Sequence, residues 1–419
     1  MLFRIALALL FAWSLVARSA EGADYSYPYR DPYLATATTA LLGSDGRCVS
    51  PSILRVPGLP GRNTLPTLEG RGNVSLSLYR QDRPAPLLFI LPGLGANPYF
   101  GVAPYLGDLF HCEGFQVVIL PSPMSWNFAL SASRSGAPGY APQDAKDLYE
   151  VMQKTLTTLR DRYTIEPTMI HFLGVSLGAL EGAYLSVIDA DEGKIGIAKY
   201  LLVNPPVDLA YAVNKIDEWR KLARKFGPEK SQQLVSRALA IVDTFSDERR
   251  DDPAVFERLA KKFAGFTTEE FQFLIAENLH SQLPELVYAT QVIHDQKVLA
   301  APKNDMRKRL EEAKTFTLTD YHRKIALPFW QKQAGDSQAD SESFLRRSSL
   351  AGIMDRLRSN RKVHILHNAD DFLAERKSIE ALKETLGDQV TLYPYGGHLG
   401  NLWYPENKKA VLRILPSIV

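Results

Sequence analysis

A single serine stands between two glycines at residues 174–178, which read Gly174-Val175-Ser176-Leu177-Gly178. The apolar run before this segment is typical of a strand, and the small residues after it favour a helix. A serine hydroxyl is a weak nucleophile near neutral pH, so it needs a base and an acid that orients the base. Glycines allow the sharp strand-to-helix turn that exposes such a serine. The pattern therefore predicts Ser176 as a nucleophile, and the alternative is an ordinary tight turn.

In this context the motif resembles that of the α/β-hydrolase family, and the resemblance covers residues 72–206 and 355–419. It implies that an acid and then a histidine follow the serine, each after one of the last strands. The sequence has both: "VHILHNADDFL" is strand-like and leads into Asp370 and Asp371, and "VTLYPYGGHLGN" is strand-like and leads into His398.

The resemblance favours Asp371 as the acid, because the family's HGxxD pattern puts the acid four residues after the strand-end histidine, here His367. Asp370 is the alternative acid, and in that case Asp371 caps the following helix. Only His398 lies in a late, glycine-flanked loop. We expect structural roles for the histidines in strand-like and helix-like segments: His111, His171, His280, His294, His322, His364 and His367.

Two backbone N–H groups are expected to stabilise a developing oxyanion. The resemblance assigns one to Leu177, directly after the serine, and the other to Leu94. Leu94 lies in the loop "PGLG", which is similar to the family's HGxG with Pro92 in place of the histidine. The alternative for this loop is a plain turn.

Alternating elements surround these loops. The strand-like segments are "NVSLSLYR", "PLLFILPG", "FQVVILPSP", "TMIHFLG" and "AKYLLVNPPVDL". Residues 142–163 place apolar side chains on one helical face. Such alternation predicts an α/β fold with a mostly parallel central sheet covered by helices on both faces. The predicted core is residues 71–206 and 355–419.

Residues 207–354 interrupt this alternation with consecutive polar, helix-like segments. The resemblance implies that they form an α-helical cap insertion over the active site. Aromatic side chains in this segment either line an apolar pocket or pack in the interior of the insertion; they are Phe266, Phe271, Phe273, Tyr321, Phe329 and Trp330.

The N-terminus has the layout of a secretory signal peptide, with Arg4, an apolar run of thirteen residues and then small residues. We expect a signal peptide over residues 1–19, with cleavage after Ser19; cleavage after Gly22 also fits. The protein is then exported, to the periplasm or the medium, and is membrane-anchored only if the signal is not cleaved. Residues 20–70, rich in Pro, Gly and Tyr, are predicted to form an extended arm with a short helix near residues 33–43.

Charge and cysteine content narrow the function classes. Lys plus Arg number 49 against 47 Asp plus Glu, so no net field favours a nucleic-acid partner. The two cysteines, Cys48 and Cys112, either form one disulfide, as export allows, or are separate buried thiols.

Taken with the resemblance, these residues predict a serine hydrolase that cleaves a carboxylic ester of a small-molecule or lipid-like acyl compound through an acyl-enzyme. No metal or organic cofactor is required. Two alternatives stay open. The same residues could act on amides or peptides or transfer the acyl group to an alcohol, and the fold could serve as a non-catalytic binding scaffold.

Overall fold

The computed structural model describes residues 25–44, 48–62, 72–245, 248, 252–334 and 340–416. The predicted signal peptide, residues 1–19, lies outside these ranges. No helix within them combines the length and the apolar character that crossing a bilayer requires.

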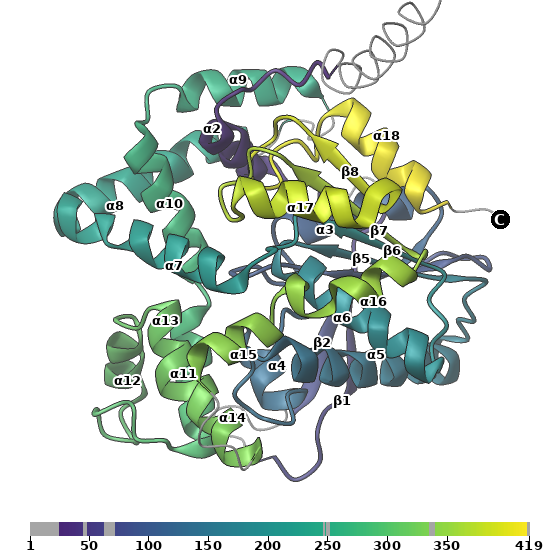
Figure 1. Cartoon of the computed structure of the whole chain (residues 1–419), viewed down its shortest axis with the longest axis horizontal. Helices are drawn as coiled ribbons and strands as arrows, with labels where there is room; N and C mark the ends of the chain where they lie inside the picture. The colour runs from purple at the N-terminus through teal and green to yellow at the C-terminus, as the bar shows by residue number, and fades with distance from the viewer. Residues whose placement is uncertain are drawn as a thin grey trace, which may run out of the picture.

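One central sheet organises the molecule (Figure 1). Among the described residues its strand order is β1-β2-β4-β3-β5-β6-β7-β8. The strands are β1 (Ser52–Pro57), β2 (Asn73–Tyr79), β3 (Leu87–Leu91), β4 (Gln116–Ile119), β5 (Ile170–Val175), β6 (Lys199–Val203), β7 (Val363–Asn368) and β8 (Val390–Tyr393). The pairs of β2 with β1 and β4 are antiparallel, and all other pairs are parallel. This order is that of the α/β-hydrolase fold, so the predicted fold is confirmed.

Helices cover both faces of the sheet. On one face, the core contains buried side chains of α5 (Ala141–Tyr163), α6 (Leu177–Glu192), α16 (Met354–Ser359) and α17 (Arg376–Leu386). On the other face, α3 (Val102–Cys112) and α18 (Pro405–Ile414) contribute to a second core. Because both faces are covered, every residue of β3 and β4 is buried. Two short elements, α4 (Trp126–Ser131) and η5 (Gly387–Gln389), complete this part of the chain.

Strand β1 departs from the extended arm expected over residues 20–70. Among the described strands it is an edge strand that pairs with β2 alone, and its burial alternates, with Leu54 and Val56 inward and their neighbours exposed. An edge strand tolerates flanking proline and glycine, because one side of it has no ladder to interrupt. That composition hid the strand in the sequence.

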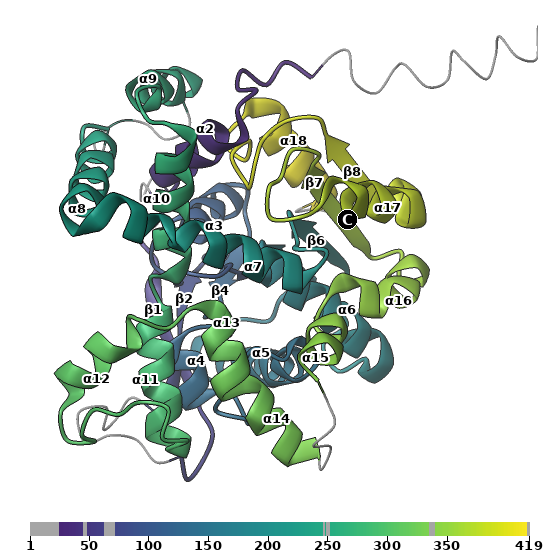
Figure 2. The same ribbon diagram turned by 60° about the vertical axis from the view of Figure 1, so that its left-hand side comes forward.

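A series of helices joins β6 to β7, from Leu209 to Ser359. Figure 2 shows α7 crossing in front of the sheet, with α8 to α10 on one side of it and α11 to α14 on the other. The elements before α16 are α7 (Leu209–Arg220), α8 (Leu222–Asp243), α9 (Pro253–Phe263), α10 (Thr268–His280), α11 (Leu283–His294), α12 (Met306–Ala313), α13 (Leu318–Tyr321), η3 (His322–Ala326), α14 (Leu327–Ala334), α15 (Ser341–Arg347) and η4 (Leu350–Ile353).

The N-terminal segment packs against the C-terminal part of the chain. It contains α2 (Pro32–Ala37), which Asp31 caps through hydrogen bonds from two backbone N–H groups, and η1 (Thr38–Leu41). In Figure 1 the purple α2 lies beside the yellow C-terminal segment, and hydrogen bonds such as that from Trp403 Nε1 to Thr38 Oγ1 join the two.

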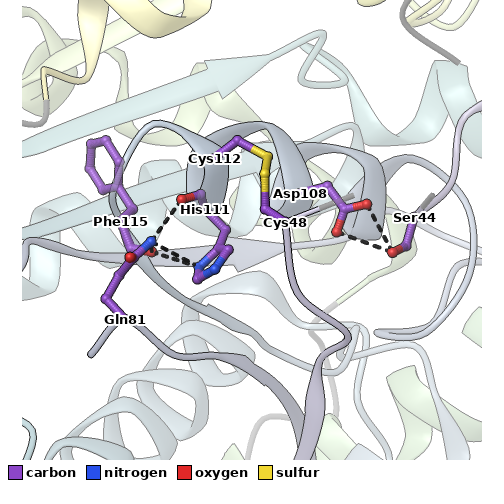
Figure 3. The surroundings of a disulfide bond; sticks show 7 residues. All are labelled: Ser44, Cys48, Gln81, Asp108, His111, Cys112 and Phe115. Carbon is purple, nitrogen blue, oxygen red and sulfur yellow. Dashed lines mark hydrogen bonds between the residues drawn. A yellow bond between two sulfur atoms is a disulfide. The ribbon is translucent and has the colours of Figure 1, made fainter. Parts of the chain in front are cut away.

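A disulfide joins Cys48 to Cys112 at the last residue of α3, with the two Cα atoms 5.7 Å apart (Figure 3). Of the two alternatives that the sequence left open, the disulfide is therefore correct. Beside it, the Ser44 hydroxyl donates to both carboxylate oxygens of Asp108 on α3, at 2.9 and 3.1 Å. These bonds fasten the segment before β1 to the sheet domain.

Candidate active site

Ser176 lies between β5 and α6 in a backbone conformation that residues other than glycine rarely adopt, with φ 55° and ψ −124°. Its N–H donates to Val203 O at 2.9 Å, which holds the turn against the neighbouring strand β6. The turn also needs glycine around it. A Cβ on Gly178 would lie 2.2 Å from Leu91 O, and one on Gly93 would lie 2.8 Å from the Cβ of Ser176. The serine is thus held above the ends of three parallel strands.

His398 reaches Ser176 from the loop after β8. The hydroxyl of Ser176 and Nε2 of His398 are 2.9 Å apart, and Nδ1 of His398 donates to Asp371 Oδ2 at 2.9 Å. All three side chains are buried. The structure thus brings together Ser176, Asp371 and His398, the three residues predicted from the sequence. Ser176 and Asp371 are 195 positions apart in the chain.

Asp371 is held by more than His398. Asn204 Nδ2 donates to Asp371 Oδ2 at 2.7 Å, and the Leu373 N–H donates to Asp371 Oδ1 at 3.0 Å. Burial by itself raises the pKa of Asp371. The charge and the hydrogen bond of His398, together with the charge of His367 and the Leu373 N–H, outweigh burial, and the pKa lies below its usual value. Asp371 therefore stays ionised and orients the imidazole.

Asp370 has a different role in the structure. Its carboxylate accepts from the N–H groups of Gly396 at 3.2 Å and Gly397 at 2.9 Å, in the loop that carries His398. Burial raises the pKa of Asp370 to about 6, against the lowering effect of these two N–H groups. The alternative acid thus binds the backbone next to His398, and its neighbour binds the imidazole.

The N-terminal segment also holds His398, which the sequence did not indicate. The His398 N–H donates to Thr36 Oγ1 at 2.8 Å, and the Tyr27 hydroxyl donates to Gly400 O at 3.0 Å. Tyr33 stacks on Phe372, the residue after Asp371, with ring centroids 5.0 Å apart. Asn204 was missed in the same way, because one polar residue after a strand carries no pattern of its own.

The two leucines assigned to an oxyanion site lie beside Ser176. Leu177 is the first residue of α6, where a helix leaves its backbone N–H without an intrahelical acceptor. Leu94 follows Gly93, whose Cα lies against Ser176, and both leucines line the same pocket as Ser176. The N-terminal end of α6 also favours negative charge at this point.

That pocket has mostly apolar walls. They come from the loops after β3 and β4, from α6 and from the helices between β6 and β7, with Met124, Leu209, Val213, Ile216, Leu279 and Leu318 among them. Of the six aromatic residues considered above, Tyr321 lines this pocket. Phe266, Phe271 and Phe273 belong to a buried core, and Phe329 and Trp330 pack against another. Interior packing is therefore the main role of this group.

Other histidines bind different partners: His367 Nε2 contacts Pro205 O at 3.1 Å, and His364 Nε2 contacts Thr391 Oγ1 at 3.0 Å. His322 lines the same pocket as Ser176, but its Nε2 contacts Ser341 Oγ at 2.6 Å. Across the described ranges, no three His, Cys, Asp or Glu side chains gather in a way that would hold a metal ion.

No family model and no curated protein matches this sequence. Solved structures similar to it include brefeldin A esterase, a bacterial homologue of human hormone-sensitive lipase, at 14% identity and a TM-score of 0.43 over 97% of this chain and 90% of its own. A membrane phospholipase A, described as a bacterial virulence factor, is 14% identical with a TM-score of 0.42 over 99% and 98%. Carboxyl esterase 2 of the fungus Tuber melanosporum is 15% identical with a TM-score of 0.41 over 96% and 94%. At identities and TM-scores this low, the activities of these proteins cannot be assigned to this chain.

Proposed function

We propose that this α/β-hydrolase is an exported serine hydrolase that cleaves carboxylic esters through an acyl-enzyme on Ser176. The observation that carries the proposal is the hydrogen-bonded series from Ser176 Oγ through His398 to Asp371, at 2.9 Å for each step. It lies at an apolar pocket, where a carbonyl compound can be shielded from water.

The reaction begins when His398 Nε2 takes the proton of the Ser176 hydroxyl as its oxygen attacks the carbonyl carbon. The ionised Asp371 stabilises the imidazolium that forms. The negative charge moves to the former carbonyl oxygen, where the N–H groups of Leu94 and Leu177 donate to it. As the tetrahedral intermediate collapses, His398 gives its proton to the leaving alcohol. In the second half of the reaction, His398 takes a proton from water as the water oxygen attacks the acyl carbon. The carboxylic acid leaves when the bond to Ser176 Oγ breaks and His398 returns the proton to Ser176.

A fluorophosphonate probe tests this function directly, because it reacts only with an activated serine. We expect the wild-type protein to be labelled and Ser176→Ala to remain unlabelled. Ser186→Ala removes another buried serine of α6 and should label like the wild type. A wild-type protein that does not label would contradict the proposal.

Two substrate series then separate esters from amides. We expect hydrolysis of p-nitrophenyl esters, and little or none of the matching anilides, since the ester is the bond that we assign. Preferential cleavage of the anilides would favour an amidase instead, and product transfer to an added alcohol would favour an acyltransferase.

Export is supported by the signal-like N-terminus and by the Cys48–Cys112 disulfide, because such bonds persist in oxidising compartments. When the full chain is produced in a bacterial host, the mature protein should begin at Ala20, or at Ala23 for the second cleavage position. A cytoplasmic protein that retains Met1 would contradict this part of the proposal.

A further inference from the structure

Two carboxyl groups line the same pocket as Ser176. Glu181 lies on α6 four residues after Leu177, which places both on one face of the helix, about 6 Å apart along its axis. Asp144 lies in the first turn of α5. Both residues are almost entirely buried, with exposed fractions of 2% for Glu181 and 1% for Asp144.

Each of these carboxyl groups has an oxygen that no group in the described ranges satisfies, Oε2 of Glu181 and Oδ1 of Asp144. The second oxygen of Asp144 accepts from the Gly139 N–H at 2.6 Å. Nearby polar groups of the pocket bind elsewhere. The Tyr321 hydroxyl donates to Pro138 O at 2.6 Å, and His322 Nε2 lies 2.6 Å from Ser341 Oγ.

Asp147 adds a third carboxyl group near the pair and acts on both. Its oxygens accept from the Arg134 N–H at 2.8 Å and from Gln143 Nε2 at 2.9 Å, and the guanidinium Nε of Arg134 lies 3.8 Å from Asp147 Oδ1. Burial first, and the neighbouring carboxyls second, raise the pKa of Glu181 well above its usual value, and burial likewise raises that of Asp144. An apolar residue at either position would avoid this desolvation penalty, so packing alone does not explain the pair.

We propose that Glu181 and Asp144 bind a protonated amine of the substrate, so that the preferred ester carries an ammonium group several atoms from its carbonyl carbon. This inference deepens the proposed function and rests on it. An ammonium group donates hydrogen bonds to both free oxygens once the carboxyl groups are ionised. Its positive charge also offsets the repulsion that ionising both groups would cause, and a neutral hydroxyl has no such charge. The apolar walls between Ser176 and the pair suit an unbranched methylene chain.

Binding of such a cation favours the ionised carboxylates. The empty pair, whose pKa values are raised, then loses a proton as the ammonium enters. Uptake of the amine is therefore accompanied by proton release, which binding of an alcohol of the same length does not cause.

A pair of p-nitrophenyl esters tests the inference in the active protein: the 6-aminohexanoate and the heptanoate, which differ by an ammonium in place of a methyl group. We expect kcat/KM of the wild type to favour the amino ester by at least about tenfold, the size of one charged hydrogen bond. Glu181→Gln and Asp144→Asn should each reduce this preference. Glu192→Gln, the same substitution at the exposed end of α6, should retain it. Equal rates for the two esters, or a preference that survives in Glu181→Gln, would overturn the inference while leaving ester hydrolysis intact.

Calorimetric titration of Ser176→Ala gives a readout that does not depend on catalysis. n-Pentylammonium chloride should bind at least about tenfold more tightly than 1-pentanol. Titration in two buffers of different ionisation enthalpy should show proton release for the amine only. If the amine does not bind, the inference is wrong whatever the wild type hydrolyses.

Discussion

Asp370 and Asp371 are neighbours in sequence, but they bind different parts of one loop. Asp371 accepts from the imidazole of His398, and Asp370 accepts from the N–H groups of Gly396 and Gly397. One aspartate therefore orients the histidine ring, and the other fixes the backbone that carries it.

This division predicts unequal effects of two matched substitutions. Asp371→Asn presents an amide that does not hold the required tautomer of His398, and kcat should fall by about 10⁴-fold. Asp370→Asn keeps a carbonyl oxygen for one of the two N–H groups, so we expect a loss of about tenfold. Steady-state kinetics on one p-nitrophenyl ester compare the two, with circular dichroism to check folding. A larger loss in Asp370→Asn than in Asp371→Asn would contradict the assignment.

The hydrogen bond from the His398 N–H to Thr36 predicts that a substitution in the N-terminal segment lowers kcat. Thr36→Val keeps the shape of the side chain but removes the acceptor of the His398 N–H, which leaves a buried donor unsatisfied at about 1–3 kcal/mol. We expect kcat to fall about tenfold or more, with little change in KM, because the loop of His398 shifts.

Thr39→Val serves as the matched control. The Thr39 hydroxyl donates to Thr36 O at 2.7 Å, within the N-terminal segment itself. It should lower stability slightly and leave kcat near that of the wild type. Equal effects of the two variants on kcat would show that Thr36 acts through general stability.

The position of the site could be predicted because the resemblance to the α/β-hydrolase family implies an acid and a histidine after the last strands. The structure has Ser176, Asp371 and His398 in the loops after β5, β7 and β8, whose parallel strands end at one edge of the sheet. The choice of Asp371 over Asp370 rested on the resemblance of the "HNADD" segment to the HGxxD pattern.

The support of His398 by Thr36 could not be predicted in this way. The two residues are 362 positions apart, and a hydroxyl that accepts a backbone N–H leaves no periodicity or motif. Strand β1 was missed for a related reason: four of its six residues are exposed, so its two inward side chains gave too short an alternation. Contacts set by tertiary packing alone stay invisible to local patterns.

The disulfide predicts a large stability difference. It closes a loop with a sequence separation of 64 residues, and loss of that constraint from the unfolded chain corresponds to about 4 kcal/mol in the chain-entropy model. Replacing Cys48 and Cys112 together by alanine should lower the free energy of unfolding in urea by about 2–4 kcal/mol. Reduction of the wild type should give a similar loss, whereas a loss under about 1 kcal/mol would contradict a constraint of this size.

His171 predicts how stability depends on pH. It is fully buried in β5, and burial, aided by the charge of Lys199, lowers its pKa to about 4. In the unfolded chain a histidine titrates near pH 6.5, so the unfolded state binds the proton first as pH falls. The stability associated with neutral His171 is therefore complete above about pH 6.5 and is lost progressively between about pH 6.5 and 4.

His171→Leu removes the titrating group and puts an apolar side chain of similar size in its place beside Phe115. The loss of unfolding free energy between pH 6.5 and 4 should be smaller in the variant than in the wild type by about 2 kcal/mol. Urea unfolding at four pH values across this window measures the difference. Parallel curves for the two proteins would show that His171 keeps an ordinary pKa in the fold, because a group with the same pKa in both states contributes no slope.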